Sequence, residues 1–139
     1  MSCRRQRQMC IRDSLYVGHY FLLGGPGETT NTVDQTLERT TRLDKCVLFF
    51  FCGMRIYPQT ELFNIPSAEG QANGSETRLD PVFYRSTSID SREILARVQE
   101  KAAGQPNWII GDGGEQTAEV LSRLYHRGHT GPLWEHLIR

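Results

Sequence analysis

Residues 15–30 read LYVGHYFLLGGPGETT, and this stretch decides the fold. The apolar run over residues 15–23 predicts a strand, the segment Gly24-Gly25-Pro26-Gly27 predicts a tight turn, and the threonines after it predict the start of a helix. Glycine suits a backbone that reverses sharply or lets a ligand approach, because it has no Cβ. Glu28 follows where the positive end of a helix dipole favours a carboxylate. The turn is therefore either a plain strand-to-helix connection or part of a cofactor site.

Residues 45–57, which read KCVLFFFCGMRIY, are strongly β-prone and contain a second, continuous apolar run from Cys46 to Cys52. Continuous runs of this kind are typical of parallel strands that helices cover. Between the two runs, Thr29 or Thr30 can cap a helix that extends to about Leu43. Strand, helix and strand with short joints form a right-handed βαβ unit. We therefore predict an α/β fold with parallel strands over about residues 15–23 and 46–57.

The remainder of the chain is predicted to be mainly helical. Asp90 and Glu93 resemble a capping box at the start of a helix that Gly104 ends. Before this helix, the pattern predicts a short helix from Glu61, a loop over 71–80 and an extended segment over 81–84. After it, the pattern predicts an extended segment over 107–110, a long helix over about 115–127, and one or two amphipathic turns over 133–138.

The composition limits the classes of function. A chain of 139 residues is at most one ordinary domain, and its 16 basic and 16 acidic residues balance, so we expect no nucleic-acid partner. No apolar run is long enough for a transmembrane segment. The four cysteines lack paired metal-ligand spacing, and we expect reduced thiols in a cytoplasmic protein and no metal site.

The first fourteen residues, MSCRRQRQMCIRDS, differ from the rest in composition. They are rich in arginine and glutamine and have no hydrophobic period. One interpretation is a basic arm. The interpretation we favour is translated sequencing-adapter read-through, as found at the ends of reading frames assembled from metagenomic DNA, with the true chain truncated just upstream of Leu15. On the second interpretation these residues are not part of the fold.

Two known nucleotide motifs do not fit the glycine turn. A Walker phosphate loop needs Gly-Lys-Ser/Thr, and the dinucleotide fingerprint needs Gly-x-Gly-x-x-Gly in register; neither is present. At the end of the second run, Arg55 and Tyr57 are either ligand-binding residues at the carboxyl end of a parallel strand or locally bonded surface residues.

The two strand ends together resemble the C-terminal part of a radical S-adenosylmethionine (radical SAM) enzyme barrel. In that superfamily, Ile-x-Gly-x-Pro-Gly-Glu-Thr forms the fifth strand and its turn, and Tyr-Pro-Gly-Thr-x-Leu ends the sixth. FLLGGPGETT matches the first motif and GMRIYPQTEL matches the second. Tyr20 replaces a strand glycine and Gln59 replaces the glycine after Pro58. The segments PVFYRS, PNWII and RGHTGPLWEHLIR resemble the tail of cobalamin-binding members, including those of lipid-type biosynthesis.

The resemblance implies a site for the adenosyl group of S-adenosylmethionine. Leu22 and Gly24 would lie beside the adenine, Glu28 would brace the turn, and the backbone of residues 56–58 would help hold the base. The full set of expected cofactor-binding residues is Leu22, Gly24, Gly25, Pro26, Gly27, Glu28, Arg55, Ile56, Tyr57 and Pro58.

The resemblance also implies parts that this sequence lacks. The superfamily holds its 4Fe–4S cluster with a Cys-x-x-x-Cys-x-x-Cys loop, and that spacing is absent here. A cobalamin-binding domain is absent too. The expectation is thus a fragment of a radical SAM enzyme: residues 15–70 from a partial (β/α) barrel, and residues 71–139 as a mainly helical C-terminal extension. Such a fragment has no catalytic residues of its own. Its parent would act on a small-molecule substrate, and the missing N-terminal barrel half would be its main packing partner.

The alternative is a small self-contained α/β binding or interaction module whose glycine turn is purely structural. The two hypotheses differ in what they expect of the sheet. A barrel fragment should bring both turns to the same end of two parallel strands and leave an unpaired edge and exposed apolar surface. A self-contained module should instead close its core.

Overall fold

The computed structural model describes residues 16–65, 81–111 and 114–138. Residues 1–14, the start of the first predicted strand at Leu15, and the predicted loop over 71–80 lie outside this range. In chain order the elements are the strand β1 (Val17–Leu23), the helix α2 (Thr30–Thr40), the strand β2 (Cys46–Cys52), the helix α4 (Ser91–Ala102), the strand β3 (Trp108–Ile110), the helix α5 (Gly114–His126) and the short 3-10 helix η1 (Leu133–Leu137).

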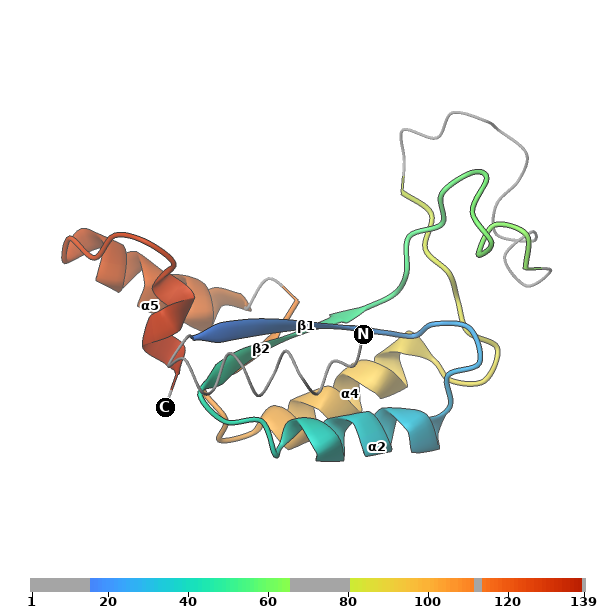
Figure 1. The fold of residues 1–139 in the computed structure, drawn as a ribbon, viewed down its shortest axis with the longest axis horizontal. Coiled ribbons are helices and arrows are strands. Elements are labelled where there is room, and N and C mark those ends of the chain that lie inside the picture. Colours follow the sequence, from blue (N-terminus) through green and yellow to red (C-terminus); the bar gives the residue numbers. More distant parts are fainter. Residues whose placement is uncertain (1–15, 66–80, 112–113, 139) are drawn as a thin grey trace.

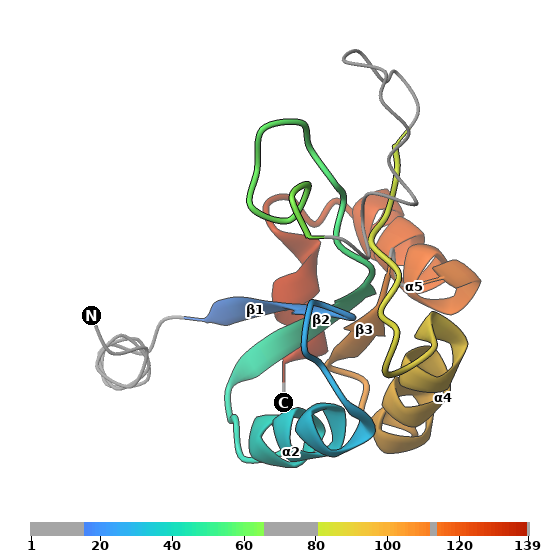
Figure 2. The same cartoon turned by 90° about the vertical axis from the view of Figure 1, so that its right-hand side faces the viewer.

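The three strands form one parallel sheet in the order β1-β2-β3. Val17 pairs with Cys46 and Leu23 with Cys52, so the first two strands run side by side over their whole length. Helices α2 and α4 connect successive strands and lie on the same face of the sheet (Figures 1 and 2). Right-handed crossovers in a sheet whose strand order does not reverse place their helices in this way. The predicted α/β class with a parallel βαβ unit is confirmed.

Local signals in the sequence define the starts of both connecting helices. The Thr29 hydroxyl accepts a hydrogen bond from the Thr32 amide at 3.3 Å, and the Thr32 hydroxyl accepts one from the Thr29 amide at 2.9 Å. This reciprocal pair satisfies two amides that the first turn of α2 leaves without partners. The Asp90 carboxylate accepts from the Arg92 amide at 2.7 Å and caps α4 in the predicted place.

The core lies between the sheet and these two helices. Its largest fully buried side chains include Phe50 and Leu48 of β2, Leu37 of α2 and Ile94 of α4. The Phe50 ring also packs against Trp108 of β3, with ring centroids 4.8 Å apart. Successive strand residues point to opposite faces, so every second residue of β1 and β2 enters this core.

The second strand ends earlier than predicted. It stops at Cys52 because Gly53 adopts φ +97°, a left-handed conformation that leaves the pleat. The chain then pairs with a distant segment: the Ile56 amide donates to the Val82 carbonyl at 2.8 Å, and the Tyr84 amide donates to the Met54 carbonyl at 2.7 Å. The prediction of a strand to Tyr57 was wrong, since these residues exchange backbone hydrogen bonds with residues 82–84.

Two predicted helices also differ from the structure. The segment from Glu61 forms turns and no helix, although the Thr60 hydroxyl accepts from the Phe63 amide at 3.4 Å, as a cap would, and donates to the Tyr57 carbonyl at 2.7 Å. Helix α2 ends at Thr40 and not near Leu43. The buried Thr40 hydroxyl donates to the Leu37 carbonyl at 2.7 Å, which gives the last turn a local partner.

The C-terminal half contributes to the sheet as well as supplying helices. The Leu48 amide donates to the Asn107 carbonyl and the Gly111 amide donates to the Phe50 carbonyl, each at 2.8 Å. The segment β2–α4–β3 is thus a second parallel βαβ unit in the same sheet. Only α5 and η1 follow it among the described residues. No helix in the part of the chain that the structure describes is long and apolar enough to cross a membrane.

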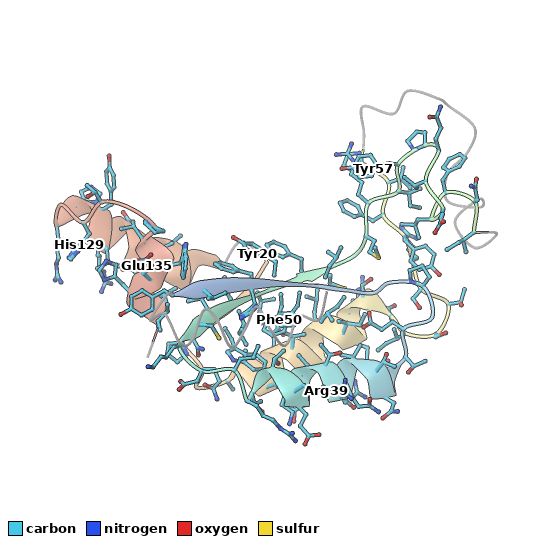
Figure 3. The ribbon with its side chains drawn as sticks, in the orientation of Figure 1. Tyr20, Arg39, Phe50, Tyr57, His129 and Glu135 are labelled. Carbon is cyan, nitrogen blue, oxygen red and sulfur yellow. The ribbon has the colours of Figure 1, made fainter. Side chains whose placement is uncertain are left out.

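The second face of the sheet is only partly covered. Helix η1 lies against β2 (Figure 2), and on this face Val47 and Ile109 are buried. Toward β1 the same face is open: Tyr20 is 70% exposed, Leu22 54% and Phe51 37%. Figure 3 shows Tyr20 and Phe50 pointing to opposite sides of the sheet. We call the surface formed by Gly18, Tyr20, Leu22, Phe49 and Phe51 the open face.

Candidate functional site

The glycine turn after β1 is closed by a carboxylate. One oxygen of Glu28 accepts hydrogen bonds from the amides of Gly24 and Gly25, the second at 3.2 Å, and the Glu28 amide donates to the Gly25 carbonyl at 3.2 Å. Gly24 and Gly27 have φ of +88° and +75°, which favour glycine. Glu28 precedes the N-cap Thr29 and braces the turn itself, so its carboxylate serves the glycine amides and not the helix end.

The end of β2 packs directly against this turn. The Gly53 amide donates to the Leu23 carbonyl at 2.8 Å. A Cβ placed on Gly24 would lie 3.5 Å from the Gly53 nitrogen, and one on Gly25 would lie 3.1 Å from the Met54 sulfur. The two strand ends therefore meet at the carboxyl edge of two parallel strands, and of these two glycines only Gly25 lies where a Cβ would be tighter than an ordinary contact.

The second predicted motif, residues 55–58, follows Gly53 and Met54 in the chain. Arg55 to Pro58 belong to the segment that rises from the sheet, where Figure 3 places Tyr57 above the open face. The Arg55 guanidinium lies over the Tyr57 ring, 5.0 Å from its centroid, and Tyr57 is 52% exposed. Ile56 is buried in a small cluster with Tyr84. The structure thus brings the glycine turn to Gly53 and Met54, which the sequence interpretation did not include.

The exposure of the predicted residues determines what a ligand could reach. Leu22, Pro26 and Gly27 are exposed, whereas Gly24 is buried. Since Glu28 already accepts from the Gly24 and Gly25 amides, these two donors are engaged. A ligand at this edge would meet apolar surface from Leu22 and the partly buried Met54 more than free amides. That chemistry suits the face of a planar, weakly polar ring.

A polar loop completes this end of the sheet. Residues 85–93 line a hollow beside the start of α4. The Cys52 thiol donates to the Ser91 carbonyl at 3.8 Å, and the Thr30 hydroxyl donates to Glu93 at 3.4 Å. The loop therefore adjoins both the end of β2 and the start of α2.

The two described cysteines are suited to packing. Both lie on the helix-covered face, as their even spacing along β2 predicts. Burial, with a smaller effect from Asp44, raises the pKa of Cys46 to about 11, and burial also raises the pKa of Cys52. Thiolates are the reactive form of cysteine, so neither side chain is an activated nucleophile at neutral pH.

The described histidines form no metal centre. The His126 ring lies 2.7 Å from the Ser122 carbonyl through Nδ1, and the rings of His129 and His136 meet edge to face with centroids 4.7 Å apart. Within residues 16–65, 81–111 and 114–138, no three histidine, cysteine or acidic side chains are grouped so as to hold a metal ion.

Comparison with known proteins adds no assignment to this geometry. The chain matches no protein-family model, no curated protein and no solved structure.

Proposed function

We propose that the chain is the C-terminal part of a radical SAM enzyme barrel, and that its glycine turn and the end of β2 are one wall of the adenosyl pocket for S-adenosylmethionine. The observation that carries the proposal is the contact of the Gly24–Gly25 turn with Gly53 and Met54 at the carboxyl ends of adjacent parallel strands. Parallel α/β folds bind their ligands at this edge.

The layout of the sheet supports a barrel origin. The strand order does not reverse and both connecting helices lie on one face, as in one arc of a (β/α) barrel. The open face would then line the barrel interior, and the free edge of β1 would receive the preceding strand. This is the exposed edge and apolar surface expected of a barrel fragment. The missing N-terminal half of the barrel is accordingly the proposed packing partner.

The other cofactors of the superfamily do not fit the residues present. A 4Fe–4S cluster needs three closely spaced thiolates, and the four cysteines at positions 3, 10, 46 and 52 do not have that spacing. We therefore assign no catalytic step to this chain. The cluster, any cobalamin and the small-molecule substrate belong to the parent enzyme in this proposal.

One observation favours the alternative of a self-contained binding or interaction module. The Glu28 carboxylate accepts from both the Gly24 and Gly25 amides, as it would in a turn with a purely structural role. A nucleotide-binding turn often keeps such amides for its ligand. The two proposals therefore differ in whether an adenine ring binds beside Leu22.

Titration with adenosine and with S-adenosylmethionine, followed by amide chemical shifts in NMR, separates them. We expect shifts at Leu22, Gly24, Gly25 and Met54, with a dissociation constant of about 1 mM or weaker, because only part of a pocket is present. Uridine should leave these signals unchanged, since it lacks the purine ring.

Matched variants test the position of the site. Leu22→Asp places a charge beside the proposed base, while Val120→Asp places the same charge on an exposed apolar residue of α5. Adenosine shifts should be lost in the first and retained in the second. Shifts that are absent in the unmodified chain, or equal in both variants, would leave the structural-turn alternative.

A further inference from the structure

The outer edge of β1 carries backbone groups that the sheet does not use. Among the described residues β1 pairs with β2 alone. The Leu23 carbonyl accepts from the Gly53 amide, so Leu23 directs its backbone groups toward β2. These directions alternate along a strand, so Val17, His19 and Phe21 do the same. The amides and carbonyls of Gly18, Tyr20 and Leu22 therefore point to the free edge.

Nothing in β1 protects this edge. The strand reads VGHYFLL and contains no lysine, no acidic residue and no proline. Folded proteins usually guard long edges with such residues or with a bulge, because a bare edge pairs with other chains. The formal net charge of the chain is zero, so two copies do not repel each other at long range.

We propose that this edge pairs with β1 of a second copy, antiparallel, about a twofold axis at Tyr20. In that register Tyr20 faces Tyr20 of the second copy and Gly18 faces Leu22. The three residues with free backbone groups are thereby matched to one another as hydrogen-bonded pairs. The result is a continuous six-stranded sheet with both helical layers on the same side.

The edge favours a second copy over an unrelated peptide because it is self-complementary. Donors and acceptors are spaced symmetrically about Tyr20, and the small Gly18 leaves room for the Leu22 side chain opposite it. The two Tyr20 rings, each 70% exposed in the single chain, become cross-strand neighbours on the open face. This inference does not depend on S-adenosylmethionine binding. In a longer parent the same edge would take the preceding strand.

Charge variants on the axis test the register. Tyr20→Lys and Tyr20→Glu each place like charges directly opposite one another, so each should sediment as a monomer where the unmodified chain is a dimer. Mixing the two variants should restore a dimer that contains one copy of each. Phe51→Lys and Phe51→Glu are the matched controls, because they place the same charges on the open face but away from the edge; both should stay dimeric.

A second pair of variants tests the backbone bonds. Tyr20→Pro removes the amide at the free edge without removing a β1–β2 hydrogen bond, whereas Tyr20→Thr keeps the amide. Dimerisation should be roughly tenfold or more weaker in the proline variant than in the threonine variant. Circular dichroism checks that both remain folded.

Four results would overturn the proposal: a monomeric unmodified chain, no dimer in the Tyr20 mixture, dissociation by the Phe51 charges, or equal dimerisation of the proline and threonine variants. None of them bears on the adenosine titration, so the two proposals can fail separately.

Discussion

The two faces of the sheet differ sharply in cover although they are built from the same strands. On the face packed by α2 and α4, Leu48 and Phe50 are at most 1% exposed. On the open face, Tyr20 and Phe51 are exposed, and Tyr20 stacks on Phe49 with ring centroids 4.6 Å apart. The aromatic rings of the open face thus contact one another across the strands, with little cover from helices.

This difference shows that burial in β2 is set by connectivity more than by residue type. The run CVLFFFC is apolar on both sides, as expected of a strand covered on both faces. The two right-handed crossovers supply helices to one face only. Further chain, such as the other strands of a barrel, is needed to cover the rest, because a second copy paired at the β1 edge extends this face without covering it.

The largest expected effect on stability is that of an alanine substitution at Phe50, and the same substitution at Phe51 is its control. Phe50→Ala should lower the free energy of unfolding by about 3–5 kcal/mol, because it empties a site between the sheet and both helices. Phe51→Ala, one residue later on the open face, should lower it by about 1 kcal/mol or less. Chemical denaturation of the two variants and the unmodified chain, at a concentration where the chain is monomeric, measures both values.

Equal losses of unfolding free energy at Phe50 and Phe51 would contradict the difference in cover between the two faces. A loss at Phe51 as large as that at Phe50 would mean that another part of the chain covers the open face in solution. The comparison is direct, because the two substitutions remove the same atoms from neighbouring residues of one strand.

Alanine substitutions at Gly24 and Gly18 compare how strongly the backbone requires glycine in the turn and on the open face. Gly24→Ala should cost about 1–3 kcal/mol, because φ is +88°, a left-handed conformation that alanine rarely adopts. At Gly18 the new Cβ would be in ordinary contact with the Phe49 ring at 3.4 Å on the open face, so Gly18→Ala should cost much less. Thermal unfolding of both variants gives the order, and a larger loss at Gly18 would refute the assignment of strain to the turn.

The sequence predicted those parts of the fold that local chemistry specifies. The glycine turn, the Thr29 and Asp90 caps and the parallel pairing all follow from residue type and spacing. The end of β2 did not, because the Arg55–Tyr57 segment is as β-prone as the strand before it. Its partner, residues 82–84, lies more than twenty residues away in the chain, and local patterns do not encode such pairing.

The candidate site was predictable in kind but not in detail. The glycine turn at a strand end was evident, and Glu28 could be expected near it. Its bonds to the amides of Gly24 and Gly25 depend on the path of the turn and had no sequence signal. Gly53 was a usable signal that the interpretation passed over, since a glycine that ends an apolar run often marks a close approach of backbones.

Cys46 gives a smaller, pH-dependent effect on the covered face. Its pKa is raised to about 11 in the folded chain, mainly by burial, from a usual value of 9.0. The stability due to the neutral thiol is complete below pH 9 and is lost as the pH rises toward 11, because the unfolded chain releases the proton first. We expect a loss on the order of 1–2 kcal/mol across that range. Cys46→Ala should show a smaller alkaline loss, and denaturation of both chains at pH 8, 9 and 10 measures it.

An unchanged alkaline slope in Cys46→Ala would contradict this assignment. Tyrosines and lysines also titrate in this range, so the difference between the two chains is the quantity that matters. Cys52, whose pKa is raised in the same direction, remains in both chains and therefore cancels.

The smallest effect is expected on the outside of the helical layer. Arg97 of α4 donates to both oxygens of Asp34 of α2, at 2.8 and 2.9 Å, and is the described ion pair that joins these helices. Both side chains remain partly exposed, so water and salt weaken the attraction. A double-mutant cycle with Asp34→Ala and Arg97→Ala should give a favourable coupling that falls as salt is added.

The pair Glu38–Arg42 within α2 is the control, since its atoms are 3.5 Å apart and both side chains are largely exposed. Its coupling should be weaker than that of Asp34–Arg97. If the two couplings are equal, the hydrogen bonds from Nη1 of Arg97 to the two Asp34 oxygens add nothing to the packing of α2 on α4. The covered face would then depend on its apolar core alone, and the contrast between the two faces would come entirely from which side chains the helices bury.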